Sequence, residues 1–505
     1  MAENRPYLLG LDAGNTVIKA VLFDRHGKQI ASHGVDGATH KPSPGMVERS
    51  LPELWENAKT AIGGCIEKAG IDPRDIAAIG TAGHGNGLYL FDRDGQPLIG
   101  IQSLDIRAAA LAAELDEAAG GKMHAISLQR PWPSQTPVLL AWLKRHRPDL
   151  YERAGTLLFA KDVVTRYLTG ARVSEISDMS GAGLLRLPDT TYDTELLALY
   201  GLEDAQALMP DLLQPTSVAG RVTPEAAQAT GLAAGTPVMA GYFDVVASAL
   251  GSGAVGPGAA SIVAGSWSIN QVFSEAPVRD ERVFMVAAYG PGLFVNMENS
   301  ATSAANLEWY VRSLIERGGH HDDPFGVVNR LVGEVAPAHD DPLFHPFLYG
   351  GRLGAHQRGG FFGLAGWHGE GHMLRAIFEG VMFEHRRHIE VLDEAGVSFA
   401  NAALSGGGSR SDHWPQMFAD GLGVPVTVAE ASETGALGAA IAASVGVGIY
   451  PDERAAVRAM TRPARHFAPD PAMGAHYDRR YAIWTRLTQA VDPLWRELGE
   501  RKTDA

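Results

Sequence analysis

The sequence predicts an α/β protein built from two domains, and three observations lead to that prediction. The chain has 505 residues, whereas a single hydrophobic core stops growing at roughly 250–300 residues. Short apolar runs of strand length alternate with segments of helical periodicity, which is typical of α/β folds. A strand–turn–strand pattern recurs in the two halves, as "LGLDAGNTVIKAVLF" and "SIVAGSWSINQVF". We therefore expect two domains on one plan, residues 1–253 and 254–505, with a boundary near Gly251–Gly258.

The first half is expected to open with a strand–turn–strand unit. Leu8–Asp12 and Thr16–Asp24 are apolar runs joined by Ala13-Gly14-Asn15, which is typical of a hairpin. A second hairpin follows with His26-Gly27 at its tip, and Leu51–Ala69 repeats apolar residues at helical spacing. The other elements expected in this half are strands at 76–80 and 88–91, on either side of a Gly-rich loop, and a helix at 245–250.

The second half follows the same order. Ala259–Ala264 and Ser268–Phe273 are predicted strands around a second turn, and Asn401–Leu404 is a strand that runs into three glycines. A helix is expected next at 411–422. The segment that begins at Glu433 is rich in small residues, so we interpret it as a helix packed close to a neighbour. After about Arg465 the pattern predicts a C-terminal helical tail.

Composition and charge narrow the class of protein. The apolar fraction of 45% and charged fraction of 20% are ordinary for a globular protein. A net charge of −15 argues against a nucleic-acid binder, which needs a basic face. Cys65 is the only cysteine, so the chain has no internal disulfide and a cytoplasmic location is expected. The uncharged stretch Val245–Ser274 is full of Gly, Ser and Pro, so we expect no membrane span.

The first turn carries residues suited to phosphoryl transfer, which needs backbone donors, a metal ion and a base. Asp12 ends a strand, and a carboxylate there can reach Mg²⁺. Gly14 lets the backbone approach a phosphate, the N–H groups of Asn15 and Thr16 would point at it, and Lys19 adds a positive charge. An ordinary hairpin turn is the alternative interpretation, and the sequence contains no P-loop motif.

Two later turns could complete a nucleotide site. Gly265 and Ser266 repeat the first arrangement, and two such turns facing each other would clamp the phosphates of one ATP. The Gly-rich stretch that contains Gly407 leads into a helix, which is typical of an anion or nucleotide site. The alternative is a plain helix N-terminus with Ser411 as its cap.

Asp244 is the candidate catalytic base. It stands where a strand ends and a helix begins, so we expect it to cap the helix with an exposed carboxylate of low pKa. His84 and Asn86 offer hydrogen bonds to sugar hydroxyls, and Trp132 offers an apolar wall for a sugar face; a solvated histidine and a purely packing tryptophan are the alternatives. The remaining polar candidates, read as structural hydrogen-bonding positions, are Lys161, Asp162, Asp178 and Ser180.

The chain resembles the FGGY carbohydrate kinases over about Leu8 to Tyr450. The most specific stretch is "LSGGGSRSDHWPQMFADGLGVPV" followed by "ETGALGAAIAA", supported by "AKDVVTRYLTG", "GYFDVVASALGSG" and "AGSWSINQVF". The resemblance implies two actin-like, ribonuclease-H-like ATPase domains around a central cleft, with sugar bound by the first and nucleotide by the second. It also implies ATP and Mg²⁺ as cofactors and, by analogy, a homodimer.

The resemblance also implies roles for individual residues. Asp244 falls on the family's base and Asp12 on the carboxylate near Mg²⁺. The other positions are Gly14, Asn15, Thr16 and Lys19 for the first phosphate motif, Gly265 and Ser266 for the second, Ala304, Gly407 and Ser411 for the nucleoside, and His84, Gly85, Asn86, Trp132 and Asp244 for the substrate.

The substrate loop departs from the Gln-Met-His-Gly pattern of xylulokinases, since His84 and Asn86 replace the Gln and the His. The run 243–246, with Trp132, is closest to L-xylulose and erythritol kinase-type members. We expect phosphorylation of a pentulose of xylulose type; the alternative is a polyol or sugar acid such as erythritol, glycerol or gluconate. From other classes, an actin-like ATP-gated switch is the competing hypothesis, whereas Asp12 and Asp244 argue against a pseudokinase.

Overall fold

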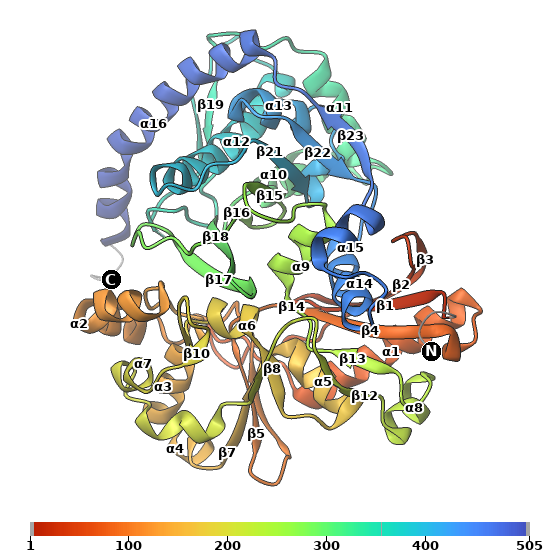
Figure 1. Cartoon of the computed structure of the whole chain (residues 1–505). Coiled ribbons are helices and arrows are strands. Elements are labelled where there is room, and N and C mark those ends of the chain that lie inside the picture. Colours follow the sequence, from red (N-terminus) through yellow and green to blue (C-terminus); the bar gives the residue numbers. More distant parts are fainter. Residues whose placement is uncertain (1–4, 355, 501–505) are drawn as a thin grey trace. The chain divides into compact units, whose positions relative to one another are not determined.

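The computed structural model describes residues 5–354 and 356–500, which form two compact units. The first unit contains the chain up to Pro257 together with Phe273–Asn296 and Ala431–Arg462. The second contains Gly258–Val272, Met297–Glu430 and the chain from Pro463 onward. The chain therefore passes between the units several times, and each unit combines segments that are distant in sequence (Figure 1).

The first unit is built on a sheet with strand order β12-β13-β4-β1-β2-β3, in which β14 also pairs with β4. β1 runs antiparallel to β2 and parallel to β4. The strands are β1 (Tyr7–Ala13), β2 (Val17–Asp24), β3 (Gln29–Asp36), β4 (Ile76–Gly83), β12 (Val218–Arg221), β13 (Pro237–Met239) and β14 (Tyr242–Phe243).

Helices cover both faces of this sheet (Figure 1). On one face, α1 (Leu51–Ala69) and α5 (Ala160–Thr169) pack on Leu9 and Leu11 in one apolar core that also buries Cys65. On the other face, α14 (Thr434–Gly446) lies directly on the strand backbones. A Cβ at Gly10 or Gly80 would lie 1.9 Å from Ala436 O or 1.7 Å from Ala439 O. Glycine is therefore required at both positions, because only a bare backbone lets the helix approach this closely.

The other elements of the first unit surround this layer, with a small sheet of order β6-β5-β7. The strands are β5 (Leu88–Asp92), β6 (Pro97–Ile101), β7 (Ala154–Leu158), β8 (Val173–Glu175), β9 (Leu185–Arg186), β10 (Thr191–Tyr192), β11 (Asp211–Leu213) and β17 (Met285–Gly290). The helices are α2 (Ala109–Ser127), α3 (Thr136–His146), α4 (Pro148–Tyr151), α6 (Ile176–Gly181), α7 (Thr194–Leu199), α8 (Pro224–Thr230), α9 (Asp244–Gly251) and α15 (Glu453–Met460).

The second unit repeats the strand–turn–strand plan. β15 (Ala259–Ala264) is antiparallel to β16 (Ser268–Ser274) and parallel to β21 (Asn401–Ser405). The sheet continues through β22 (Val426–Ala429) to β23 (Pro463–Phe467). β18 (Leu293–Ser300) pairs with β16 in the same sheet. The other elements are β19 (Leu343–His345), β20 (Gly360–Phe362), α10 (Ala305–Tyr310), α11 (Pro324–Gly333), α12 (Glu370–Glu394), α13 (Trp414–Leu422) and α16 (Pro471–Glu500).

Most expected elements are present, but the strand expected at 76–80 continues to Gly83, and two further boundaries differ. The helix expected at 411–422 begins at Trp414, because a 3₁₀ turn, Gly407–Arg410, precedes it. The tail expected after Arg465 becomes helical only at Pro471, since Arg465 lies in β23, which pairs antiparallel with β22. None of the helices described by the structure is long and apolar enough to span a bilayer.

Candidate active site

Two carboxylates lie at the same edge of the first unit's sheet. Asp12, near the end of β1, pairs in register with Ala82 of β4. On the opposite side of β4, Tyr242 and Phe243 of β14 pair with Ala82 and Gly83, and Asp244 follows directly. Asp12 and Asp244 therefore flank the carboxyl end of β4, where ligands of α/β proteins usually bind.

The environment of Asp244 differs from the expectation of an exposed carboxylate with a low pKa. Asp244 is half-buried and is the first residue of α9, while Phe243 occupies the capping position. Burial raises the pKa of Asp244 well above its usual range, and the nearby carboxylate of Asp12 raises it further. The expected low pKa is wrong because a carboxylate that loses water beside a second carboxylate resists ionisation.

Asp12 has a similar but weaker perturbation. Burial raises its pKa to about 6, although Lys19 opposes the shift and Glu433 adds to it. Its Oδ1 is buried and has no hydrogen-bond partner in the part of the chain that the structure describes, and a Cβ at Gly435 would stand 2.6 Å from its Oδ2. An unsatisfied carboxylate oxygen beside a position kept free of side chain fits a hard cation such as Mg²⁺.

Lys19 makes an ion pair that the sequence did not indicate. Its Nζ lies 2.7 Å from Oε2 of Glu433, at the N-terminal end of α14. Both side chains are partly exposed. The sequence offers one signal for Glu433, its place directly before a helix of small residues. That pattern by itself indicates only close packing of the helix.

Side chains of the first unit bind the carbonyl groups of the turn Gly14–Thr16. Arg49 donates to the Gly14 carbonyl at 2.9 Å and also to the Asn15 carbonyl. Gln102 donates to the Asn15 carbonyl at 2.9 Å. Since the carbonyls are bound on this side, the turn is fixed, and Thr16 at its tip is exposed.

The loop after β4 buries its polar side chains. His84 is 2% exposed and its Nε2 lies 2.9 Å from the Tyr89 hydroxyl, so it is not a solvated loop histidine. Burial lowers the pKa of His84 to about 3, with Arg49 contributing, so the imidazole is neutral. Asn86 has a φ of 60°, a left-handed conformation that is uncommon outside glycine. Among the described residues, His84 Nδ1 and Asn86 Oδ1 are buried and have no hydrogen-bond partner, which fits a site that binds a polar ligand.

Trp132 belongs to the same unit and is half-buried. Its ring packs against Phe284 with centroids 5.6 Å apart, and its Nε1 is buried without a partner among the described residues. Packing alone therefore explains the ring, but it leaves the indole N–H available to an acceptor.

In the second unit, the Gly265 turn and the Gly-rich turn lie together. The Ala304 N–H donates to the Gly265 carbonyl at 2.8 Å. Gly406 has a φ of 84°, and a Cβ there would stand 2.7 Å from the Ala264 carbonyl oxygen. Ser266 is exposed at the tip of its turn. The structure thus brings Gly265, Ala304 and the glycines 406–408 to one place.

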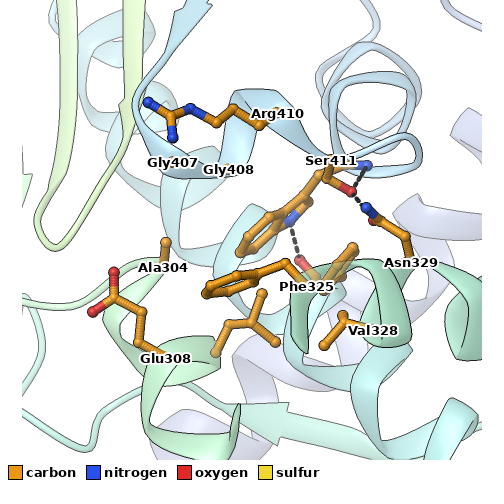
Figure 2. A pocket seen from close by; sticks show the side chains of 12 residues that line it. Ala304, Glu308, Phe325, Val328, Asn329, Gly407, Gly408, Arg410 and Ser411 are labelled. Atoms are coloured by element: carbon orange, nitrogen blue, oxygen red, sulfur yellow. Dashed lines mark hydrogen bonds between the residues drawn. The ribbon is translucent and has the colours of Figure 1, made fainter. Parts of the chain in front are cut away.

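A pocket of about 400 Å³ opens beside these turns (Figure 2). Phe378 and Trp414 stack in its wall with centroids 4.3 Å apart and planes 12° apart. A mostly apolar slot with an aromatic wall suits a flat heterocycle. The lining residues are Ala304, Leu307, Glu308, Phe325, Val328, Asn329, Phe378, Gly407, Gly408, Arg410, Ser411 and Trp414.

Ser411 lies in this pocket and also supports the helix start. Its hydroxyl donates to Asn329 Oδ1 at 2.9 Å (Figure 2) and accepts from the N–H groups of His413 and Trp414. In the view of Figure 2, Arg410 lies at the upper left and Glu308 at the lower left. The sequence did not indicate Asn329 and Phe325 as pocket residues, because α11 carries no motif and is distant in sequence from glycines 406–408.

Comparisons with known proteins agree with this arrangement. The model of the FGGY family of carbohydrate kinases matches with its N-terminal domain over residues 7–251 and its C-terminal domain over 260–447. A probable L-xylulose kinase of Pasteurella multocida is 34% identical over 492 residues, covering 97% of this chain and 99% of the relative. The L-xylulose/3-keto-L-gulonate kinase of Escherichia coli is 32% identical over 499 residues, covering 98% and 99%.

Among solved structures, the xylulose kinase from Rhodospirillum rubrum superposes with a TM-score of 0.87 at 28% identity, covering 97% of this chain and all of the other. This likeness confirms the expected fold class of two actin-like ATPase domains. Because both family domains match and relatives above 30% identity span nearly the whole chain, this protein belongs to the FGGY family of carbohydrate kinases and is an ATP-dependent carbohydrate kinase.

Proposed function

We propose that this kinase transfers the γ-phosphoryl group of ATP to a hydroxyl of a pentulose of the xylulose type, with Asp244 as the base. The observation that carries the proposal is the placement of Asp12 and Asp244 on either side of the β4 end, next to the polar loop His84–Asn86. The names of the relatives in P. multocida and E. coli support a pentulose. The second name also supports a sugar acid as the alternative substrate.

Asp244 accepts the proton of the attacking hydroxyl. Its raised pKa makes it a stronger base, once it is ionised, than an exposed carboxylate. His84, Gly85 and Asn86, with Trp132, bind the sugar. Three buried side-chain atoms without a partner among the described residues, His84 Nδ1, Asn86 Oδ1 and Trp132 Nε1, match hydroxyl groups. The neutral imidazole of His84 can donate or accept one hydrogen bond without adding charge.

Asp12 is proposed to hold Mg²⁺, since its buried Oδ1 lacks a partner and Gly435 leaves room beside it. When bound, Mg²⁺ would supply positive charge beside the phosphates of ATP, and the Asp12 carboxylate would hold it there. Gly14, Asn15, Thr16 and Lys19 bind phosphate from the first unit. In the second unit, Gly265 and Ser266 bind phosphate, and the pocket that contains Ala304, Gly407 and Ser411 binds the adenosine.

Replacing Asp244 by Asn tests the base. We expect turnover to fall by about 10²–10⁴-fold, the usual contribution of a general base, while ATP binding is nearly unchanged. Asp452→Asn is the matched control, because Asp452 only caps α15 and Asn caps helices equally well. Near-normal turnover in the Asp244 variant would show that another group is the base.

A thermal-shift screen with a non-hydrolysable ATP analogue tests the substrate. Ketopentoses, tetritols and sugar acids are compared, and a true substrate stabilises the folded protein by about 2.7 kcal/mol at a hundredfold excess over its dissociation constant. Stabilisation by a sugar acid alone would favour the alternative substrate. The kinase family favours sugar phosphorylation over an ATP-gated switch. The homodimer, the cytoplasmic location and the functional domains 1–253 and 254–505 stay predictions.

A further inference from the structure

A buried ionic cluster lies in the first unit, and the proposed mechanism does not use it. Lys161 Nζ lies 2.5 Å from Asp162 Oδ1, 3.0 Å from Asp178 Oδ2 and 3.4 Å from Glu175 Oε1. The four side chains are at most 2% exposed. One ammonium thus contacts three carboxylates that are shielded from water. Removing these charges from water costs free energy that only close pairing and further hydrogen bonds can offset.

The electrostatics of the cluster favour one fixed arrangement. Burial alone would lower the pKa of Lys161, but the three carboxylates outweigh it and raise that pKa, so the ammonium stays charged. Burial raises the pKa of Glu175 and of Asp178, although Lys161 opposes both shifts. Glu175 also accepts hydrogen bonds from the N–H groups of Ser177 and Asp178 at the start of α6. Glu175 is therefore anchored by the ammonium on one side and by the helix on the other.

Ser177 connects this cluster to the segment that carries Asp244. Its hydroxyl donates to Glu175 Oε1 at 2.8 Å and accepts from the Phe243 N–H at 2.9 Å. A hydroxyl can donate only one hydrogen bond, and Ser177 donates it to Glu175. Towards the Phe243 N–H the hydroxyl oxygen therefore acts as the acceptor. Phe243 directly precedes Asp244, and α9 has no side-chain cap of its own.

The same short helix α6 also contacts the substrate loop. A Cβ at Gly85 would lie 2.8 Å from Asp178 Oδ1, so the loop backbone rests on this carboxylate. The Asn86 side chain donates to the Gly181 carbonyl at 3.3 Å. Gly181 in turn lies against the Phe243 ring, since a Cβ there would stand 3.2 Å from it. One helix thus contacts both the loop proposed to bind sugar and the segment that carries the base.

We propose that Ser177 is a positioning residue for phosphoryl transfer: its hydroxyl, oriented by Glu175, holds the Phe243 N–H and so fixes Asp244 relative to the loop His84–Asn86. This inference rests on the proposed role of Asp244 as the base. Its importance follows from the sensitivity of catalysis to position, since a displacement of about 1 Å at a catalytic group costs about a hundredfold in rate.

The test compares Ser177→Ala with Ser177→Thr and with Ser174→Ala. Ser174 is a matched control because it is equally buried in the adjacent β8, and its hydroxyl has no partner among the described residues. We expect Ser177→Ala to lower kcat by about tenfold or more with KM for ATP unchanged, because misplacing the base affects the transition state rather than nucleotide binding. Ser177→Thr keeps the hydroxyl and should retain most of the rate.

Hydrogen exchange of the peptide that contains the Phe243 amide gives a second readout that does not depend on activity. This amide should exchange faster in Ser177→Ala than in Ser174→Ala, because it has lost its acceptor. If Asp244→Asn is inactive while Ser177→Ala matches Ser174→Ala in both kcat and exchange, the inference alone fails. If Asp244→Asn remains active, the proposed function fails and the positioning role fails with it. Equal losses in the Ala and Thr variants would also overturn the role of the hydroxyl.

Discussion

At the scale of single residues, the proposed metal site depends on the missing side chain of Gly435 as much as on the carboxylate of Asp12. Gly435 leaves the space beside Asp12 open, and the nearest atoms to a Cβ there would be Asp12 Oδ2 at 2.6 Å and Ser248 Oγ at 3.4 Å. Asp12 was predictable because a strand ends at it. Gly435 was not, because it lies more than four hundred residues away and only the packing of α14 on β1 brings it near.

Gly435→Ala should therefore weaken Mg²⁺ activation. The added methyl group must displace the Asp12 carboxylate, and we expect the Mg²⁺ concentration for half-maximal rate to rise by about tenfold, as for changes next to metal ligands. Titration of the initial rate with Mg²⁺ measures this. Gly366→Ala is the control, since a Cβ there meets nothing within 4 Å. An unchanged Mg²⁺ dependence would argue against Asp12 as the metal ligand.

The pKa of Asp244 also differs from the prediction based on its residue type and local position. From sequence, an aspartate at a strand-to-helix junction is a capping residue with a low pKa. The structure instead places it beside a second carboxylate in a poorly solvated position, so its pKa rises. The difference arises from desolvation and from a neighbour that is distant in sequence, and neither is written in the local pattern.

At the scale of elements, hydrophobic periodicity located the predicted helices and strands, although it left α2, α3 and α12 unassigned. The boundaries of α1 match the prediction because Ser50 caps the helix and Gly70 ends it in a left-handed conformation. The start of α13 was missed because glycines 407 and 408 form a tighter turn first. β23 was missed because its partner β22 decides its conformation, whereas its own residues carry no clear alternation.

The contact between α14 and the sheet supports a prediction about stability. Gly80→Ala puts a methyl group against the Ala439 backbone, which cannot rotate away, and we expect a loss of about 3 kcal/mol or more. Gly63→Ala is the control, because its Cβ would meet only the Thr230 carbonyl at an ordinary 3.7 Å and alanine favours the helix by about 1 kcal/mol. Urea unfolding measures both. Equal stabilities would mean that α14 is held less closely than the structure has it.

At the scale of the whole molecule, buried histidines make stability depend on pH. Burial lowers the pKa of His345 to about 4, and that of His84 and of His385 to about 3. In the unfolded chain each would titrate near 6.5, so the unfolded state binds protons first as the pH falls. The contribution of these histidines to the free energy of unfolding is therefore fully present above pH 6.5 and decreases as the pH falls below that value. Asp12 and Glu379, whose pKa values burial raises, act in the opposite direction.

A comparison with His345→Gln isolates one of these histidines. Between pH 6.5 and 5.0 the natural protein should lose about 1.5 kcal/mol more than the variant, because glutamine does not titrate. Urea unfolding at the two pH values gives the difference, and the carboxylates cancel because both proteins contain them. Parallel pH dependence in the two proteins would show that folding does not lower the pKa of His345.

The sequence by itself determined the α/β class, the repeated strand–turn–strand plan, the kinase family and the candidate carboxylates, because local periodicity, turn glycines and motifs carry that information. Only the tertiary structure decided which charges meet. It paired Lys19 with Glu433 and raised the pKa of Asp244. It also built the pocket with an aromatic wall from α10, α11, α12 and α13, and it joined Ser177 to Phe243. These facts depend on long-range packing and on the removal of water, which no local pattern specifies.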